Sequence, residues 1–325
     1  MRARTVGGTL VAVLCAIGCG GDDDDGSTGD SAGGDAGGGG SGDAAGCADE
    51  ADCPADPPAP APDGKAWALV FREEFNGADY DHDKLTPCFD WNVGGCTSSF
   101  NNGREHYQPE QIRVADGAAA MVAEPLDPPL AEGACFEGSC SYAAGLLSTA
   151  RARADDGSDY LYSFTYGYVE ARVKFPATQG FFTAFWMLPT AEDYNYRSEI
   201  DIVEILGNDP ATIFMTYHYA DRSESFSVND GVGNNGDCPA LDYSQDWVRF
   251  GVDWQPGHVA WYIDGVKCAQ FDGAAGSEIE DGPMQIILNN MVDNNWIRDW
   301  DVATTDQTQT EQMDVDYIRV HQLVE

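Results

Sequence analysis

The sequence predicts an all-β fold, either a sandwich or a barrel. Strand-like segments recur along the chain with turn residues between them, and long helical periodicity is absent. The clearest turn is Asp264-Gly265, which joins the segments 258–263 and 266–271. A two-residue turn of this composition is the strongest short-range signal of a β-hairpin. We therefore expect strands that pair through short turns.

Two segments show how the strands are buried. In the segment 168–175, small and apolar side chains occupy the odd positions, while Tyr, Glu, Arg and Lys occupy the even ones. Side chains of a strand alternate between its faces, so this strand should have one buried and one polar face. The segment 181–188 is apolar on both faces and should be central. The segments 247–254 and 313–321 complete the set, with no internal repeat and no second folded domain.

The segment 198–205, Ser-Glu-Ile-Asp-Ile-Val-Glu-Ile, places three carboxylates in an otherwise β-branched strand. Glu199 and Asp201 share one face, whereas Glu204 falls on the other face unless one residue is bulged out. With that bulge, the two glutamates can approach the ~5–5.5 Å carboxyl separation of a retaining glycosidase. The alternative is a polar strand face in water. Three like charges on one face repel, however, and the flanking residues are too apolar for an edge strand.

The run Glu-Ile-Asp-Ile-Val-Glu resembles the bulged signature of glycoside hydrolase family 16, the laminarinase and lichenase group. Other segments resemble strands of the same family, and their order and spacing around the acid run make the resemblance specific. It covers about residues 66–322. The segments that resemble the family are 71–77, 167–174, 185–189, 218–219, 287–289 and 315–320.

The resemblance implies a β-jelly roll, a sandwich of two curved antiparallel sheets with a substrate cleft on the concave face. It also implies retaining hydrolysis of a β-glycan backbone. Carried onto this chain, Glu199 is the nucleophile and Glu204 the general acid/base. Asp201 lies between them and tunes their charge, so that the two glutamates take opposite roles.

Sugar rings stack on aromatic side chains, so we expect such residues along the cleft. The resemblance indicates these substrate-binding residues: Trp186, Tyr194, His218, Asn101, Glu105, Asn289 and Trp296. Tyr219, beside His218, is a further aromatic candidate. Three structural alternatives stay open: Trp186 as a core aromatic, His218 as a satisfied core histidine, and the segment 101–107 as a plain turn.

The chain departs from many laminarinases at four places. Tyr194 stands where they have Trp five positions before the nucleophile, and Ser198 stands where they have Gly just before it. Asp293-Asn294 replaces a Gly-Gly pair, and the segment 206–209 is closer to lichenases. The bulged acid run favours β-1,3-glucan, while the lichenase-like segment keeps mixed linkage open.

The predicted function is therefore a retaining endo-glycosidase of β-glucan, either β-1,3-glucan or mixed β-1,3/1,4-glucan. A galactan hydrolase of the agarase type and a glucan transglycosylase use the same chemistry and stay open. A non-catalytic β-glucan-binding protein is the alternative from another class. The presence of all three acids argues against it.

The formal net charge is −38, from 17 basic and 55 acidic residues. This negative charge repels nucleic acid and anionic lipid surfaces, and it argues against negatively charged sulfated galactans as substrates. No cofactor is expected to be required. Relatives in the resembled family often carry a structural Ca²⁺ away from the cleft, and the acid-rich termini offer oxygen ligands for one. We expect a monomer.

The N-terminus is predicted to lie outside the fold. Residues 1–19 have the basic start and short apolar run of an export signal. Residues 16–19, Ala-Ile-Gly-Cys, resemble a bacterial lipoprotein processing site with Cys19 as the lipidated residue, and cleavage without lipidation is the alternative. Residues 20–63 have the composition of a disordered acidic linker. The catalytic domain is then 64–325, lipid-anchored at the cell envelope or otherwise secreted.

Eight cysteines remain once Cys15 and Cys19 are set aside, and an even number in an exported chain predicts disulfides. Connectivity cannot be deduced from sequence, and proximity suggests Cys47–Cys53, Cys88–Cys96, Cys135–Cys140 and Cys238–Cys268. A metal site is the weaker alternative, because no Cys-x-x-Cys pair or His cluster accompanies them.

Overall fold

The structure is a computed structural model. It describes residues 56–91, 103–131, 139–151, 158–190, 198–220, 222–228, 236–239, 241–273, 279–299 and 302–325. These residues all belong to one compact unit, Ala55–Glu325. The predictions for the export signal, for Cys19 and for the Cys47–Cys53 pair lie outside the described residues. The predictions for Asn101 and Tyr194 lie outside them as well.

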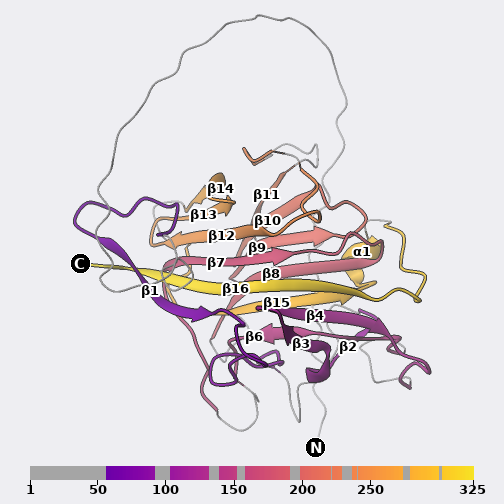
Figure 1. Cartoon of the computed structure of the whole chain (residues 1–325). Helices are drawn as coiled ribbons and strands as arrows, with labels where there is room; N and C mark the ends of the chain where they lie inside the picture. The colour runs from indigo at the N-terminus through magenta and orange to yellow at the C-terminus, as the bar shows by residue number, and fades with distance from the viewer. Residues whose placement is uncertain are drawn as a thin grey trace, which may run out of the picture. The chain divides into compact units, whose positions relative to one another are not determined.

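Two β-sheets make up this unit (Figure 1). The larger sheet has ten strands in the order β14-β13-β12-β7-β16-β4-β5-β2, with β1 paired to β16 and β3 paired to β4. Its strands are β1 (Ala66–Glu73), β2 (Glu105–Tyr107), β3 (Ile112–Ala115), β4 (Ala118–Pro125), β5 (Tyr142–Ala144), β7 (Gly167–Lys174), β12 (Val248–Gln255), β13 (His258–Ile263), β14 (Val266–Asp272) and β16 (Glu311–Val324).

The smaller sheet has six strands in the order β11-β10-β9-β8-β15-β6. These are β6 (Leu146–Ser148), β8 (Phe181–Pro189), β9 (Glu199–Leu206), β10 (Ile213–Tyr219), β11 (Arg222–Val228) and β15 (Met284–Val292). All strand pairs are antiparallel except β2 with β5.

Helix is scarce in the part of the chain that the structure describes. It is confined there to the 3-10 turn Pro109–Gln111 and the helix α1 (Asn295–Asp299). No helix in this part is long and apolar enough to cross a membrane. The predicted all-β fold of two sheets is confirmed.

The main core lies between the two sheets. Apolar side chains of β7, β12, β13 and β16 meet those of β8, β9, β10 and β15 in one buried cluster. Val169, Ala171 and Val173 of β7 are fully buried in this cluster, as the alternation along that strand predicts. β8 is buried from Phe181 to Met187, which agrees with the central position expected for it.

The predicted hairpin joins β13 to β14. Ile263 pairs with Val266, so Asp264 and Gly265 form the turn between them. Their φ angles are 48° and 83°, in the left-handed region that this type of turn requires and that Asp and Gly adopt most readily. The backbone N–H of Arg249 donates a hydrogen bond to the Asp264 carboxylate (3.0 Å), which ties the turn to β12.

The end of the predicted linker packs onto the ten-stranded sheet. Ala59 is 1% exposed and lies in a buried cluster with Tyr168 and Tyr262. The indole N–H of Trp67 donates a hydrogen bond to the Ala59 carbonyl (2.7 Å). This cover explains why Tyr168, on the expected polar face of β7, is buried.

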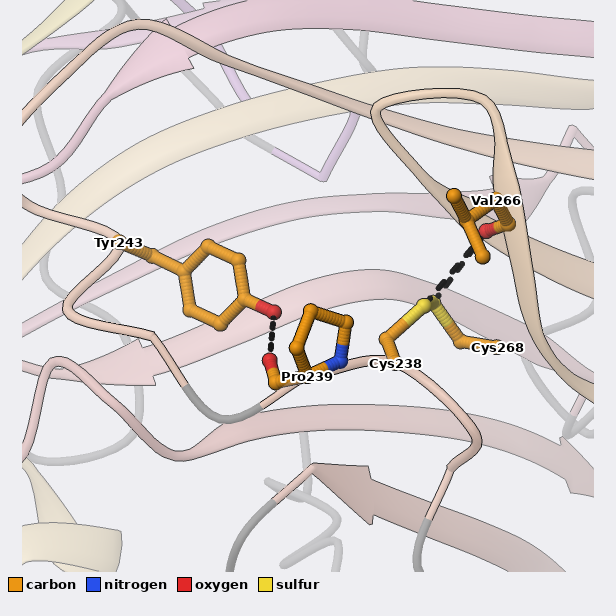
Figure 2. The surroundings of a disulfide bond; sticks show 5 residues. All are labelled: Cys238, Pro239, Tyr243, Val266 and Cys268. Atoms are coloured by element: carbon orange, nitrogen blue, oxygen red, sulfur yellow. Dashed lines mark hydrogen bonds between the residues drawn. A yellow bond between two sulfur atoms is a disulfide. The ribbon is translucent and has the colours of Figure 1, made fainter. Parts of the chain in front are cut away.

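A disulfide joins Cys238 to Cys268, and Figure 2 shows its surroundings. The bond ties the segment between β11 and β12 to the edge strand β14. In the same segment, the Tyr243 hydroxyl donates to the Pro239 carbonyl (2.5 Å). The predicted pair Cys238–Cys268 is therefore confirmed.

Cys88 and Cys140 are also disulfide-bonded, and both are fully buried. Their predicted partners, Cys96 and Cys135, lie outside the described residues. The pairs Cys88–Cys96 and Cys135–Cys140 therefore stay predictions.

Replacing Cys238 and Cys268 together with Ser is expected to lower the free energy of unfolding. The bond closes a loop with a sequence separation of 30, and constraining the unfolded chain over that length stabilises by about 3–4 kcal/mol. Guanidinium unfolding of the double variant and the wild type measures the difference. Because the bond lies at a sheet edge, turnover should be unchanged. An unaltered unfolding midpoint would contradict the stabilising role.

Candidate active site

Strand β9 carries the acid run and contains a β-bulge. On its neighbour β8, Phe185 pairs with Val203, while the next residue, Trp186, pairs with Asp201. Ile202 is therefore an extra residue in β9 at this point. The pairing of β9 with β10 shifts at the same place. The structure thus confirms the predicted bulge.

The bulge brings the three acids to one face of the six-stranded sheet. Four apolar residues of β9 are buried in the core between the sheets: Ile200, Ile202, Val203 and Ile205. Because Ile202 and Val203 are consecutive and both point to the core, the alternation changes phase between them. Glu199, Asp201 and Glu204 consequently share the opposite face. We call this side of the six-stranded sheet, turned away from the core, the acid face.

Strand pairing gives each acid its neighbours on the acid face. The residues directly across from the acids are His218 for Glu199, Thr216 and Trp186 for Asp201, and Phe214 and Ala184 for Glu204. The nucleophile candidate thus faces a basic side chain, whereas the acid/base candidate lies between apolar ones. Such different surroundings separate the protonation behaviour of two glutamates.

His218 and Asp201 form the polar contact of this face. The Nε2 atom of His218 lies 3.1 Å from Oδ2 of Asp201, whose side chain is 4% exposed. Burial lowers the pKa of His218, but the hydrogen bond to Asp201 and the charges of Asp201 and Glu199 outweigh it and raise the pKa to about 9. His218 is therefore a cation at neutral pH and donates its Nε2–H to Asp201.

The two glutamates lie in an environment that favours their neutral forms. Burial raises the pKa of Glu204 well above its ordinary value, and the charges of Asp201 and Glu199 raise it further. Burial and Asp201 likewise raise the pKa of Glu199, while the His218 cation lowers it. Glu204 has no such cation, so it is the better candidate to keep a proton and Glu199 the better candidate for the anion.

This geometry agrees with the family to which the sequence is similar. The family model "Glycosyl hydrolases family 16" matches residues 152–319, just over half of the chain, and the match includes the whole acid run. The chain belongs to glycosyl hydrolases family 16. It is a glycoside hydrolase, and the predicted family and enzyme class are confirmed.

Curated relatives of this family 16 hydrolase include two bacterial enzymes that match most of the chain. It is 26% identical over 273 residues to a beta-glucanase of Rhodothermus marinus, a match that covers 80% of this chain and 86% of that protein. It is 27% identical to glucan endo-1,3-beta-glucosidase A1 of Niallia circulans, over 78% of this chain but 37% of that protein. The chain thus spans only about a third of some relatives.

Solved structures share the fold. An endo-beta-1,3-glucanase from Pyrococcus furiosus superimposes with a TM-score of 0.60 at 26% identity, covering 81% of this chain and 97% of the other. SCLam, a non-specific endo-beta-1,3(4)-glucanase, superimposes with a TM-score of 0.62 at 25% identity. The match covers 82% of this chain and 94% of the SCLam chain. Both cover nearly the whole of the solved chain, so they support the jelly roll that the resemblance implied.

Two of the predicted substrate-binding residues in this family 16 hydrolase are buried at the acid face. Trp186 is 4% exposed and Asn289 is fully buried. The Trp186 indole N–H donates to Asn289 Oδ1 (2.8 Å), and the Asn289 amide donates to the Tyr107 hydroxyl (2.9 Å). This chain of bonds fixes the Trp186 ring beside Asp201. Tyr107 lies in the segment 101–107 but is not among the predicted site residues, although its alternation with Glu105 on one strand would have indicated it.

Glu105 is fully buried as well. Its carboxylate accepts a hydrogen bond from the Val292 backbone N–H (2.9 Å) at the end of β15. Burial raises the pKa of Glu105 to about 8, so the carboxyl is largely protonated at neutral pH. The hydrogen bond between Glu105 and Val292 links β2 to β15, the strand that carries Asn289.

Trp296 keeps part of its surface exposed and belongs to the apolar cluster that includes Trp186. Its ring packs edge-on against Phe182 and Phe214, with centroids 4.7 Å and 4.9 Å apart. The Asn294 side chain accepts a hydrogen bond from the Ile297 N–H (3.1 Å), which stabilises the start of the short helix bearing Trp296. Through Phe214, Trp296 is placed on the side of Glu204.

Tyr219 does not join the acid face. It follows His218 on β10, and neighbours on a strand point to opposite faces. Its ring is buried in the core and stacks on Phe271, with centroids 5.3 Å apart. The expectation that Tyr219 contacts substrate is wrong.

Glu199, Asp201 and His218 also form the one group among the described residues that offers metal-binding atoms close together, within 4.8 Å of one another. Two carboxylates and an imidazole suit a transition metal better than Ca²⁺, which prefers six to eight oxygen ligands. The group therefore does not fit the expected structural Ca²⁺, which stays a prediction for another part of the molecule.

Replacing His218 with Gln is expected to move the acid limb of the kcat/KM pH profile to higher pH. The His218 cation lowers the pKa of Glu199, so its loss leaves burial and the Asp201 charge unopposed. The alkaline limb, which reports the proton on Glu204, should move less, because the causes of the Glu204 shift do not include His218. A profile spanning both limbs measures the two effects. An acid limb that stays in place would contradict this arrangement.

Proposed function

We propose that this chain is a retaining endo-β-glucanase acting on β-1,3-glucan or on mixed β-1,3/1,4-glucan. The observation that carries the proposal is the bulge of β9, which brings Glu199, Asp201 and Glu204 to one face. The relatives' names support the substrate class: beta-glucanase, glucan endo-1,3-beta-glucosidase and non-specific endo-beta-1,3(4)-glucanase. Both linkages occur in these names, which is why the proposal includes both.

In the first step, the Glu199 carboxylate attacks the anomeric carbon while the bond to the leaving oxygen breaks. Glu204 transfers its proton to that oxygen. A glycosyl ester forms on Glu199 and the cleaved glucan end departs. Glu199 loses its charge as Glu204 gains one, so the total charge facing Asp201 and the His218 cation is unchanged. Asp201 and His218 can therefore keep the same arrangement in both steps.

In the second step, Glu204 is a base. It removes a proton from water, the water oxygen bonds to the anomeric carbon, and the ester bond to Glu199 breaks. The anomeric centre is inverted twice and so keeps its β configuration. Glu204 ends protonated and Glu199 ends as a carboxylate, ready for the next cycle.

Initial-rate assays on laminarin, lichenan, agarose and carrageenan test the substrate. We expect reducing ends to be released from laminarin or lichenan, and proton NMR of the first products to show the β anomer. If the α anomer forms first, the reaction inverts the anomeric centre, which would exclude a covalent intermediate. Activity on agarose alone would favour the galactan hydrolase, and activity on none of the four would favour the binding protein. Longer products with an added acceptor oligosaccharide would indicate transglycosylation.

We also propose that the chain is exported and anchored through lipid on Cys19. The support is sequence alone: the apolar run that ends in Ala-Ile-Gly-Cys, followed by an acidic Gly-rich segment. Expression in a bacterium with labelled palmitate should label the wild type but not Cys19→Ser. The Cys19→Ser variant should move from the membrane fraction to the soluble fraction. Equal fractionation of the two proteins would contradict the anchor.

A further inference from the structure

Trp261 of β13 reaches across the core to the strand that carries the acids. Its side chain is fully buried, and its indole N–H donates a hydrogen bond of 2.8 Å to the backbone carbonyl of Asp201. β13 belongs to the ten-stranded sheet and β9 to the six-stranded sheet, so this bond joins the two layers. Asp201 comes immediately before the bulged residue Ile202.

The direction of this bond shows how the backbone is turned at the bulge. Carbonyls engaged in a strand ladder point within the sheet, toward the neighbouring strand. The Trp261 N–H comes from the other sheet, so the Asp201 carbonyl that accepts its bond is turned toward the core. The bulge allows this, because a bulge disrupts the hydrogen-bond ladder locally. A buried carbonyl without a donor is unfavourable, so the Trp261 N–H stabilises the backbone conformation at the bulge.

Only one of the two catalytic glutamates depends on the bulge. Glu199 precedes it and lies on the acid face whether or not Ile202 is bulged. Glu204 follows it, and a strand without the extra residue turns every later side chain to the other face. A loss or shift of the bulge would therefore turn Glu204 toward the core and leave Glu199 in place.

We propose that Trp261 is a positioning residue for the general acid/base, which holds the bulge at Ile202 and thereby keeps Glu204 on the acid face. The inference rests on the proposed retaining mechanism. Trp261 touches neither substrate nor the reacting atoms. It acts from the opposite sheet through the Asp201 carbonyl, and its effect is specific to the proton-transfer role of Glu204.

The surroundings of Trp261 allow this role to be separated from packing. Val252 and Ala269 lie directly across from it on β12 and β14. The Phe226 ring packs against the indole, with centroids 5.5 Å apart. These contacts are apolar, whereas the indole N–H is a donor only. A phenylalanine at this position keeps most of the apolar contact and removes the donor.

Trp254 provides a matched control. It is also fully buried in the core between the sheets, on the neighbouring strand β12. Its indole N–H donates to a backbone carbonyl as well, that of Glu280 (3.0 Å), which is not part of the acid-bearing strand. Trp254→Phe therefore replaces an equivalent indole and removes an equivalent hydrogen bond without touching the bulge.

The test compares Trp261→Phe, Trp254→Phe and wild type on phenyl and 2,4-dinitrophenyl β-laminaribiosides. The phenyl substrate needs an acid to protonate its leaving oxygen, and the dinitrophenyl substrate does not. Trp261→Phe should lower kcat/KM on the phenyl substrate by about 10- to 100-fold, as expected for a misplaced catalytic group. On the dinitrophenyl substrate its kcat/KM should stay within about threefold of wild type. Trp254→Phe should leave both values within about threefold of wild type.

Equal losses on both substrates, or similar effects of the two substitutions, would overturn the role of Trp261 while leaving the mechanism standing. A wild type inactive on both substrates would overturn the proposed function, and the inference with it. If Trp261→Phe does not fold, a variant with benzothienylalanine at position 261 provides the test instead. This residue has nearly the shape of tryptophan, but sulfur replaces its indole N–H. It should reproduce the loss confined to the phenyl substrate, and normal activity with it would overturn the proposal.

Discussion

Replacing Glu199 with Gln should reduce kcat on β-glucan by about four orders of magnitude or more, the scale seen when a covalent nucleophile is removed. The amide has no charge to attack the anomeric carbon, and no other carboxylate on the acid face can replace it. Asp201 is nearly fully buried and bonded to His218, and Glu204 is needed as the acid. Steady-state kinetics of the purified variant measures the loss.

The fold should survive this change. Burial and the charge of Asp201 disfavour the ionised form of Glu199, so a neutral amide removes repulsion from the acid face. The thermal midpoint of Glu199→Gln should therefore equal or exceed that of wild type. Glu224→Gln is the matched control, because Glu224 lies on β11 near Tyr219 rather than on the acid face, and it should keep full turnover. Residual wild-type turnover in Glu199→Gln would contradict the assignment.

The position of the acids could be predicted because a strand has a strict two-residue alternation. Glu199 and Asp201 share a face in any straight strand, and Glu204 does so only if one residue is added. The structure places that residue where two apolar side chains, Ile202 and Val203, follow each other and both point to the core. The Asp264-Gly265 turn could be predicted for a similar reason, since both residues must adopt positive φ and few residue types tolerate it. Local chemistry decides both features.

The contacts behind the acid face could not be predicted, because they join residues far apart in the sequence. Asn289 was expected to contact sugar, yet it is fully buried between Trp186 and Tyr107. The hydrogen bond from Trp261 to Asp201 joins residues that are 60 positions apart in the sequence and lie in different sheets. Alternation gives the face on which a side chain lies, but it does not say which residue of the opposite sheet meets it.

Replacing Glu204 with Gln should lower kcat on β-glucan by about 10²- to 10⁴-fold, the range typical of general acid–base catalysis. The amide cannot protonate the leaving oxygen, and it cannot deprotonate water in the second step. Aryl glucosides with a good leaving group do not need the acid, so their kcat/KM should fall by less than about tenfold. Glycosylation of Glu199 then proceeds, and the ester should accumulate because its hydrolysis lacks a base.

The smaller variant Glu204→Ala separates the two roles of this residue, because azide can enter the space left by the carboxylate. Azide needs no base, so it should release the sugar from Glu199 and restore turnover of an activated substrate, with a β-glycosyl azide as product. In Glu199→Ala, azide would attack the substrate itself and give the α-glycosyl azide. The stereochemistry thus reports which face of the sugar each glutamate occupies. An α product from Glu204→Ala would reverse the two assignments, and no rescue in either variant would contradict a covalent intermediate.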